Sequence, residues 1–209
     1  MNKRDFQREL DGIIKEIEES GIRPKLLLHV CCAPCSSYCM EYLTKYFDIT
    51  LFFYNPNMDC KEEYDKRKDE LSRLVKEAAF PVKVVIMPYD PQEYLDAVKG
   101  LEDIREGGER CFACYELRMR KAAGYASQNG FDYFTTSLSI SPYKNAEKIN
   151  EIGERLSAEY GVKHLPSDFK KKNGYKRSIE LSKEYDLYRQ DYCGCVFSKK
   201  EREKKETDN

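Results

Sequence analysis

The sequence predicts an α/β protein, a Rossmann-like fold with a mostly parallel sheet and helices on both faces. Short apolar runs alternate with longer amphipathic segments along most of the 209 residues, and that alternation is typical of β-α units with parallel strands. The length suits one domain, and no repeat or Gly- and Ser-rich linker interrupts it. We therefore expect a single domain over residues 1–198 and a charged tail over 199–209, as a frayed helix or disordered.

The expected helices follow from apolar side chains at helical spacing. In the first helix, Phe6, Leu10, Ile14 and Ile17 share one face, and Gly21 ends it. The same criterion gives seven helices in chain order, over residues 3–20, 36–47, 61–79, 92–98, 115–128, 145–160 and 177–185.

The expected strands are the short apolar runs between these helices. KLLLHV and ITLFFY are the clearest, being rich in aliphatic and aromatic residues. The full set covers residues 25–30, 49–54, 82–87, 131–136 and 162–165. Sites in doubly wound sheets lie beyond the carboxyl ends of the strands. The Cys31-Cys32 pair after the first strand and residues 135–142 after the fourth should therefore face one crevice.

Charge and composition exclude several classes of protein. The 36 Lys and Arg residues nearly balance the 37 Asp and Glu residues, which argues against wholesale affinity for nucleic acid. No run of 18 apolar residues is present, and the start MNKRDFQREL lacks the apolar segment of a secretory signal. We expect a cytoplasmic protein with no membrane segment.

Nine cysteines are the most informative feature of the chain. Most fall into tight groups, Cys31-Cys32-Ala-Pro-Cys35, Cys111-Phe-Ala-Cys114 and Cys193-Gly-Cys195. In a reducing compartment, clustered thiols point to metal binding or redox chemistry. A thioredoxin-like dithiol would explain only one of the groups. Cys39 and Cys60 are expected to be core or incidental residues, and Cys35 to fill the start of a helix.

Six candidate ligands exceed what one zinc ion needs. Four thiolates satisfy either a structural zinc or a [4Fe–4S] cluster, which leaves one pair over. The remaining pair either binds a second metal or cycles between dithiol and disulfide, and a disulfide across Cys193-Gly-Cys195 would close a small, strained and easily reduced ring. His29, Asp168 and Asp191 are nearby acids or ligands, although a core histidine and solvated carboxylates are the default interpretation.

Basic residues concentrate toward the end of the chain. Residues 163–205 contain 13 Lys and Arg against 7 Asp and Glu. A dense basic loop with one aromatic residue suits RNA phosphates and a stacked base, and a solvated surface loop is the alternative. Its candidate tRNA-binding residues are Lys170, Lys171, Lys172, Tyr175, Lys176 and Arg177.

Five motifs together resemble epoxyqueuosine reductases of the QueH type. They are HVCCAPCS (29–36), YNPN (54–57), RCFACY (110–115), TTSLSISPYK (135–144) and YCGCVFS (192–198). The resemblance runs from about Leu26 to Ser198 and is specific because the motifs occur jointly.

The resemblance implies a cobalamin-independent oxidoreductase of queuosine biosynthesis. It reduces the epoxide of epoxyqueuosine to the alkene at the wobble position of tRNAs with GUN anticodons, with electrons from a donor that the sequence does not identify. It implies a HUP-like fold and a [4Fe–4S] cluster on Cys31, Cys32, Cys111 and Cys114. Cys193 and Cys195 are then a redox-active pair or ligands of an additional mononuclear iron, and Asp191, Tyr192 or His29 protonates the leaving oxygen.

Two other functions use the same residues. A zinc-stabilised tRNA-binding module would need the cysteines without chemistry. A tRNA sulfur-transfer enzyme would carry a persulfide on Cys193 or Cys195 and activate its substrate with ATP. The SGGxDS phosphate loop of such HUP-like enzymes is missing after the first strand, which argues against the use of ATP.

Overall fold

One parallel sheet organises residues 4–207, the part of the chain that the computed structural model describes. Its strand order is β3-β2-β1-β4-β5, and every neighbouring pair is parallel. The strands are β1 (Lys25–Val30), β2 (Asp48–Phe53), β3 (Val82–Ile86), β4 (Tyr133–Thr136) and β5 (Lys163–His164). The prediction of a Rossmann-like parallel sheet is confirmed.

Helices connect the strands and extend beyond the sheet. They are α1 (Phe6–Ser20), α2 (Ala33–Leu43), α3 (Lys61–Glu77), α4 (Pro91–Ala97), α5 (Glu109–Gln128), the short 3-10 helix η1 (Ser137–Ile140), α6 (Ala146–Tyr160), α7 (Gly174–Glu184) and α8 (Val196–Thr207). Residue 3 of the predicted first helix lies outside the described residues. None of the helices formed by residues 4–207 has the length and apolar character that a membrane span requires.

Most helices differ from their predicted ranges by a few residues. Helix α7 begins at Gly174 rather than at 177, so Tyr175, Lys176 and Arg177 of the expected basic loop are helical. Helix α2 begins at Ala33, because Pro34 fits its first turn, where a missing N–H costs nothing. Helix α5 begins at Glu109, after the left-handed Gly107, and therefore includes Cys111 and Cys114. Helix α8 crosses the expected boundary at 199, so that the described part of the charged tail is helical.

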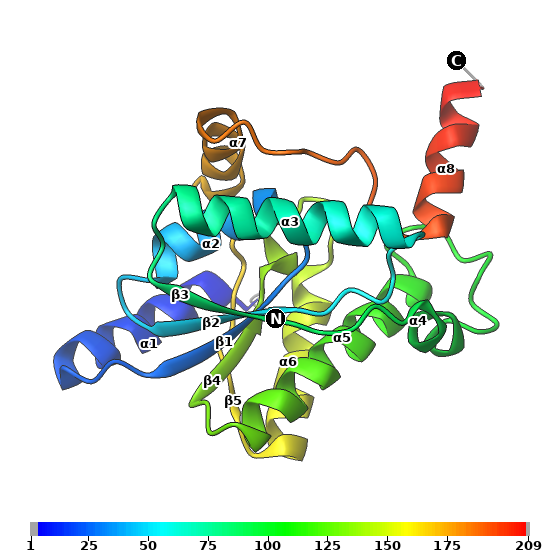
Figure 1. Ribbon diagram of the computed structural model, residues 1–209. Helices are drawn as coiled ribbons and strands as arrows, with labels where there is room; N and C mark the ends of the chain where they lie inside the picture. Colours follow the sequence, from blue (N-terminus) through cyan, green and yellow to red (C-terminus); the bar gives the residue numbers. More distant parts are fainter. Residues whose placement is uncertain (1–3, 208–209) are drawn as a thin grey trace.

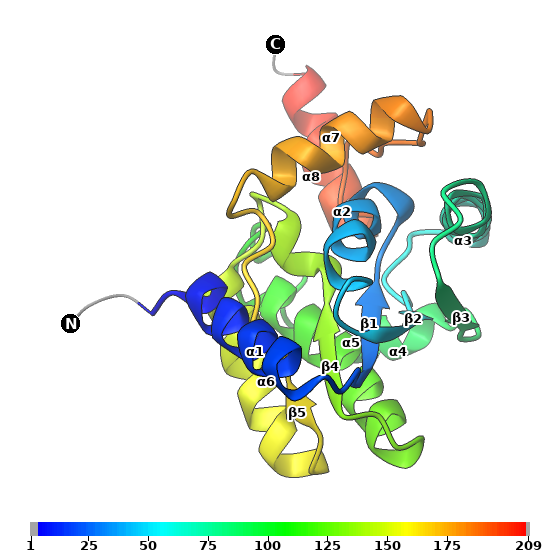
Figure 2. The same ribbon diagram turned by 90° about the vertical axis from the view of Figure 1, so that its left-hand side faces the viewer.

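The strand β1 divides the core into two layers. Leu26, Leu28 and Val30 pack with α1, α2 and α3, whereas Leu27 and Cys31 pack with α5 and α6 on the other face. This alternation follows from the two-residue period of a strand, and it places helices on both faces of the sheet (Figure 1 and Figure 2).

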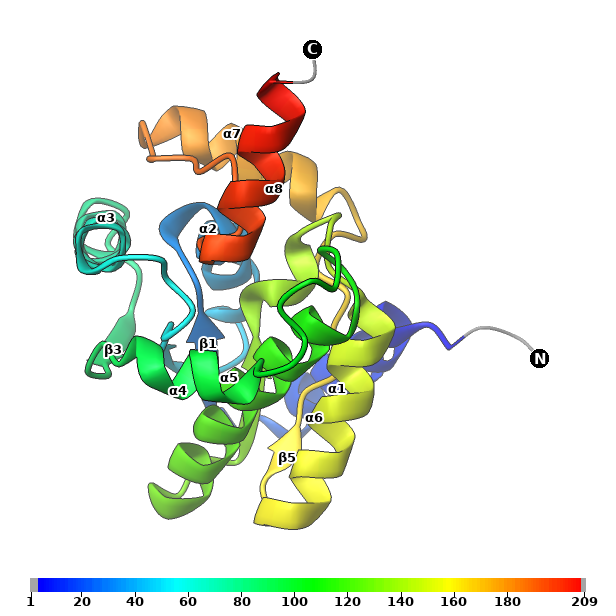
Figure 3. The same cartoon turned by 90° about the vertical axis from the view of Figure 1, so that its right-hand side faces the viewer.

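The carboxyl ends of the strands form the functional edge. In the sheet, β1 lies between β2 and β4. Strand β1 leads to α2, whereas β4 leads to α6 through η1, so the direction in which successive strands are added to the sheet reverses between β1 and β4. Helices α7 and α8 lie beyond this edge, toward which β1 points (Figure 3). Cys31 Sγ lies 3.9 Å from Ser137 Oγ of η1, as expected for segments that share a crevice.

Both histidines are buried in neutral form. His29 lies among Thr136, Tyr54 and Arg118. The ring of His164 packs against Phe134, and neither of its nitrogens has a hydrogen-bond partner among residues 4–207. Burial, helped by the positive charge of Arg4, lowers the pKa of His164 to about 3.

We predict that His164 makes the fold less stable in acid. Between pH 6.5 and 3 the unfolded chain binds a proton at this residue that the folded chain excludes, so stability falls as the pH falls. Lowering the pH from about 7 to about 5 should cost about 2 kcal/mol through this group. Urea unfolding of the wild type and of the His164→Leu variant at both pH values measures this loss of stability. The variant should lose less stability than wild type, and equal losses would contradict the assignment.

A candidate metal centre at the carboxyl ends of the strands

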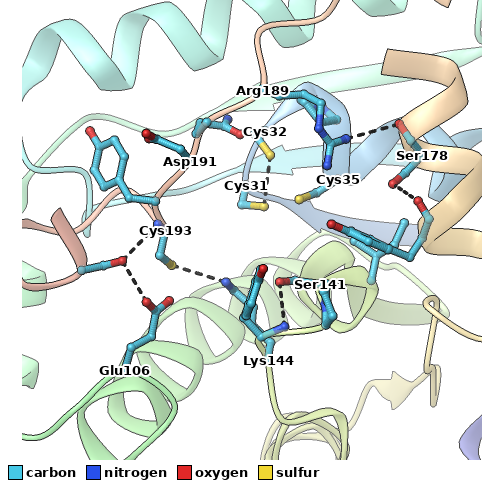
Figure 4. Close-up of a pocket in the computed structure, with 18 of the residues that line it drawn as sticks. Cys31, Cys32, Cys35, Glu106, Ser141, Lys144, Ser178, Arg189, Asp191 and Cys193 are labelled. Atoms are coloured by element: carbon cyan, nitrogen blue, oxygen red, sulfur yellow. Dashed lines mark hydrogen bonds between the residues drawn. The ribbon is translucent and has the colours of Figure 1, made fainter. Parts of the chain in front are cut away.

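Three sulfurs meet where β1 turns into α2. Cys32 is the N-cap of α2, and Cys31 and Cys35 lie on either side of it. The three Sγ atoms all lie within 4.8 Å of one another, and those of Cys31 and Cys32 are 3.6 Å apart. They line a cavity of about 340 Å³, in which Cys193 and Lys144 also lie (Figure 4). We call this the larger cavity.

The three thiols influence one another's pKa values. Hydrogen bonds from the thiols of Cys32 and Cys35 lower the pKa of Cys31 well below its usual range, and Arg118 and Lys144 add to the effect. Hydrogen bonding to Cys31 raises the pKa values of Cys32 and Cys35 in turn. Cys31 is therefore the sulfur of this group whose thiolate form the surroundings favour.

A second group of four sulfurs lines an adjoining smaller cavity. Its members are Cys111 and Cys114 of α5 and Cys193 and Cys195 of the segment before α8. Lys144 and Cys193 belong to the walls of both cavities. All nine cysteines within residues 4–207 are free thiols.

Each sulfur of this group has a donor supplied by the protein. Backbone N–H groups of Gly107 and Ser198 donate to Cys111 and Cys195 at 3.2 and 3.3 Å. Lys144 Nζ donates to Cys193 Sγ at 3.4 Å. A guanidinium N–H of Arg118 lies 4.0 Å from Cys114 Sγ. Burial nevertheless raises the pKa of Cys114 to about 12. An added cation would favour its thiolate form.

Two cations connect the sulfur groups. Arg118 is 1 % exposed and also donates to Asn55 Oδ1 at 2.5 Å. Burial alone would lower the pKa of Arg118, but Cys114 and Cys31 outweigh it and the pKa is raised. Burial likewise opposes the charge of Lys144, and Cys193 outweighs it. Both side chains therefore stay charged between sulfurs from distant parts of the sequence.

The Cys193-Gly194-Cys195 segment is held rigidly. Gly194 has a φ of +109°, and its carbonyl accepts a hydrogen bond from the backbone N–H of Asp59 at 2.8 Å. A guanidinium N–H of Arg67 donates to the carbonyl of Cys193 at 3.2 Å. These hydrogen bonds therefore hold the backbone of Gly194 in one conformation between the two cysteines.

Of the other predicted site residues, Asp191 and Tyr192 line the larger cavity, whereas Asp168 lies outside both cavities and is only 9 % exposed, so the expectation of a solvated carboxylate at Asp168 is wrong. Asp191 lines the larger cavity but is 61 % exposed, and it pairs with Arg202 at 3.1 Å. Tyr192 donates to Asp59 at 2.9 Å. Asp168 pairs with Lys170 at 2.6 Å.

The basic segment, residues 170–177, borders the larger cavity through Tyr175. Lys172 pairs with Asp11 at 2.7 Å, and Arg177 pairs with Glu41 at 2.6 Å, so these two cations also attach the segment to α1 and α2. Lys171 and Lys176 are exposed.

Sequence reasoning missed three of the side chains at this site. Cys35 is predicted to be a packing residue, although its spacing of three from Cys32 is the spacing of one helical turn. Arg118 was not missed: its sequence position suggested a cation that stabilises thiolates, and it lies beside Cys114, which it follows by four residues on α5. Lys144 and Arg189 reach the larger cavity from separate loops, and no local pattern indicates this.

The fold and the site define an α/β protein with a cysteine-rich site at the edge of its sheet where β1 and β4 end. Residues 26–201 match the family model described as "Epoxyqueuosine reductase QueH". The chain is 46 % identical over 202 residues to the QueH of Streptococcus pyogenes serotype M1, covering 95 % of this chain and 79 % of that protein. The QueH of Staphylococcus epidermidis is 45 % identical (94 % and 85 % covered), and that of Thermotoga maritima is 38 % identical (86 % and 93 %). The chain belongs to the QueH family of epoxyqueuosine reductases, which are oxidoreductases.

We predict that Gly194→Ala disrupts the site. An added Cβ would lie 2.6 Å from Met58 Sδ and 3.1 Å from the Arg67 guanidinium, and Ala is strained at this φ. The variant should lose about 1–3 kcal/mol of unfolding free energy and react faster with a thiol reagent at Cys193 and Cys195.

Gly100→Ala is the matched control. Gly100 has a φ of +81°, but an added Cβ would meet nothing within 4 Å. The Gly100→Ala variant should therefore lose only the stability that backbone strain costs. If both variants lose the same stability and keep the same thiol reactivity, the crowding at Gly194 has no role.

Proposed function

We propose that this chain removes the epoxide oxygen of epoxyqueuosine at the wobble position of tRNAs with GUN anticodons, with a metal centre on its cysteines. The reaction is a two-electron reduction in which the epoxide, two electrons and two protons yield the alkene and water. The family assignment supports the reaction. The convergence of seven cysteines on two adjoining cavities supports the metal centre.

The donor set fits an iron–sulfur cluster. Thiolates are the ligands that such clusters take, and buried cations and N–H groups compensate sulfur charge at this site. We assign the [4Fe–4S] ligands to Cys31, Cys32, Cys111 and Cys114. Cys193 and Cys195 serve as a redox-active pair or hold an additional iron. When bound, this centre supplies single electrons and an electrophile for the epoxide oxygen.

The residues around the larger cavity would bind and orient the nucleotide. Asp191 at the rim is the candidate proton donor to the leaving oxygen. Lys144 holds positive charge beside Cys193. Arg189, at the same cavity, is placed to bind a phosphate group. An anticodon base already lies in a loop, so presenting it to the cavity requires little unpairing.

The direct test is anaerobic turnover. The purified chain should contain iron and sulfide, absorb visible light, and convert epoxyqueuosine to queuosine in tRNA when a reductant is supplied, as followed by nucleoside mass spectrometry. A colourless protein with stoichiometric zinc and no conversion would instead identify an RNA-binding module. A requirement for ATP and a sulfur-containing product would identify a sulfur-transfer enzyme.

We predict that Cys193→Ala abolishes turnover while the fold persists, since its sulfur faces both cavities. Circular dichroism and the conversion assay measure the two effects. The matched control is Cys39→Ala, because Cys39 lies on the buried face of α2, in the core and outside both cavities. A fully active Cys193→Ala enzyme would remove this residue from the mechanism.

We predict that Lys171→Glu with Lys176→Glu weakens binding of the tRNA. Both side chains are exposed beside Tyr175, and the slope of log Kd against log salt concentration should fall by roughly 0.7–0.9 for each phosphate that the protein no longer neutralises. Lys25→Glu, at the amino end of β1, is the control and should bind as wild type. Unchanged affinity and slope in the double variant would exclude this surface.

A further inference from the structure

Asn57 is a buried amide that no other residue of the described chain, 4–207, pairs with. It lies in the turn after β2 and is 1 % exposed, yet neither its Nδ2 nor its Oδ1 has a hydrogen-bond partner within residues 4–207. Its neighbour Asn55 is equally buried but donates to the carbonyl of Val30 at 3.0 Å and accepts from Arg118. Native proteins rarely leave such groups unpaired, so each case needs an explanation.

The side chain of Asn57 belongs to the wall of the smaller cavity, with Cys111, Cys114, Cys193 and Cys195. The backbone on both sides of Asn57 is fixed. Met58 N donates to the carbonyl of Asn55 at 3.3 Å, and Asp59 N donates to the carbonyl of Gly194 at 2.8 Å. The amide is therefore held beside the sulfurs rather than free to turn toward solvent.

A second unpaired donor lines the same cavity. Arg110 is 2 % exposed. Its two terminal nitrogens donate to the carbonyl of Glu102 at 2.8 Å and to Glu201 at 2.6 Å, while Nε has no partner among the described residues. Two buried N–H donors therefore remain unused at one small cavity.

The four sulfurs do not account for these donors. Each already has a donor of its own, from Gly107, Arg118, Lys144 or Ser198. The two donors are therefore available to an occupant of the cavity that brings further acceptors. A bare metal ion brings none, whereas a cluster that contains inorganic sulfide brings several, and hydrogen bonds to its sulfurs adjust its reduction potential.

We propose that Asn57 is a positioning residue for a sulfide-bearing metal centre, and that its amide N–H, together with Nε–H of Arg110, donates hydrogen bonds to sulfur atoms that the centre brings into the smaller cavity. This inference rests on the proposed function and goes further by assigning residues that contact the centre without being its ligands. It also favours an iron–sulfur cluster over a lone zinc ion.

The test compares Asn57→Leu with wild type in two forms of the full chain. In the metal-free form, Leu has a similar volume and no unpaired polar atom, so the unfolding midpoint should equal or exceed that of wild type. In the form reconstituted with iron and sulfide, loss of the donor should disfavour the more negative reduced state. A shift of about ten-fold in the one-electron equilibrium, equal to about 59 mV, is expected toward lower potential. Asn57→Ala provides a second variant if Leu does not fold.

Asn55→Leu is the matched control for the stability measurement, because it breaks two existing hydrogen bonds and should destabilise the metal-free protein. An Asn57 variant that is destabilised without metal, or one with unchanged potential and iron content, would overturn the inference while wild-type turnover leaves the proposed function standing. A wild-type protein that binds no iron and sulfide would overturn both.

Discussion

The arrangement of this site depends on keeping positive charge buried next to sulfur. Arg118 and Lys144 lie between a thiol group that follows β1 and one assembled from α5 and the segment before α8. A buried cation without a partner, or a buried thiolate without one, would each be costly. When the cation and the thiolate lie side by side, each offsets the energetic cost of burying the other. The sheet brings them together at the edge where β1 and β4 end.

This constraint explains why arginine side chains take part in several polar contacts between segments that are distant in the sequence. The guanidinium of Arg118 touches His29, Asn55 and Cys114, which come from β1, the turn after β2, and α5. The side chain of Arg118 thus links the strands to α5, the helix that supplies two of the four sulfurs of the smaller cavity. Arg67 does the same for α3 and the Cys193 segment.

Much of the fold could be predicted because its determinants are local. The apolar run of β1 and the helical stripe of α1 each specify an element within a few residues, and the parallel order follows from their alternation. The six candidate ligands were also visible as short motifs. The grouping of Cys193 with Cys111 and Cys114, and the presence of Lys144 beside them, depend on where loops cross the edge of the sheet. Hydrophobic periodicity carries no information about that crossing. The start of α5 was missed because two glycines usually mark a turn, and here the turn immediately precedes the helix.

The order of the cysteines along the chain has a consequence for biogenesis. Cys31 belongs to the first β-α unit, whereas Cys195 immediately precedes the last helix. At roughly 5–20 residues per second, a ribosome would complete the second sulfur group about 10 to 30 s after the first. The sulfurs of the first group are thus synthesised well before the sulfurs that lie beside them in the folded protein. A metal centre that used sulfurs from both groups could therefore be completed only after the Cys193-Gly194-Cys195 segment had been synthesised.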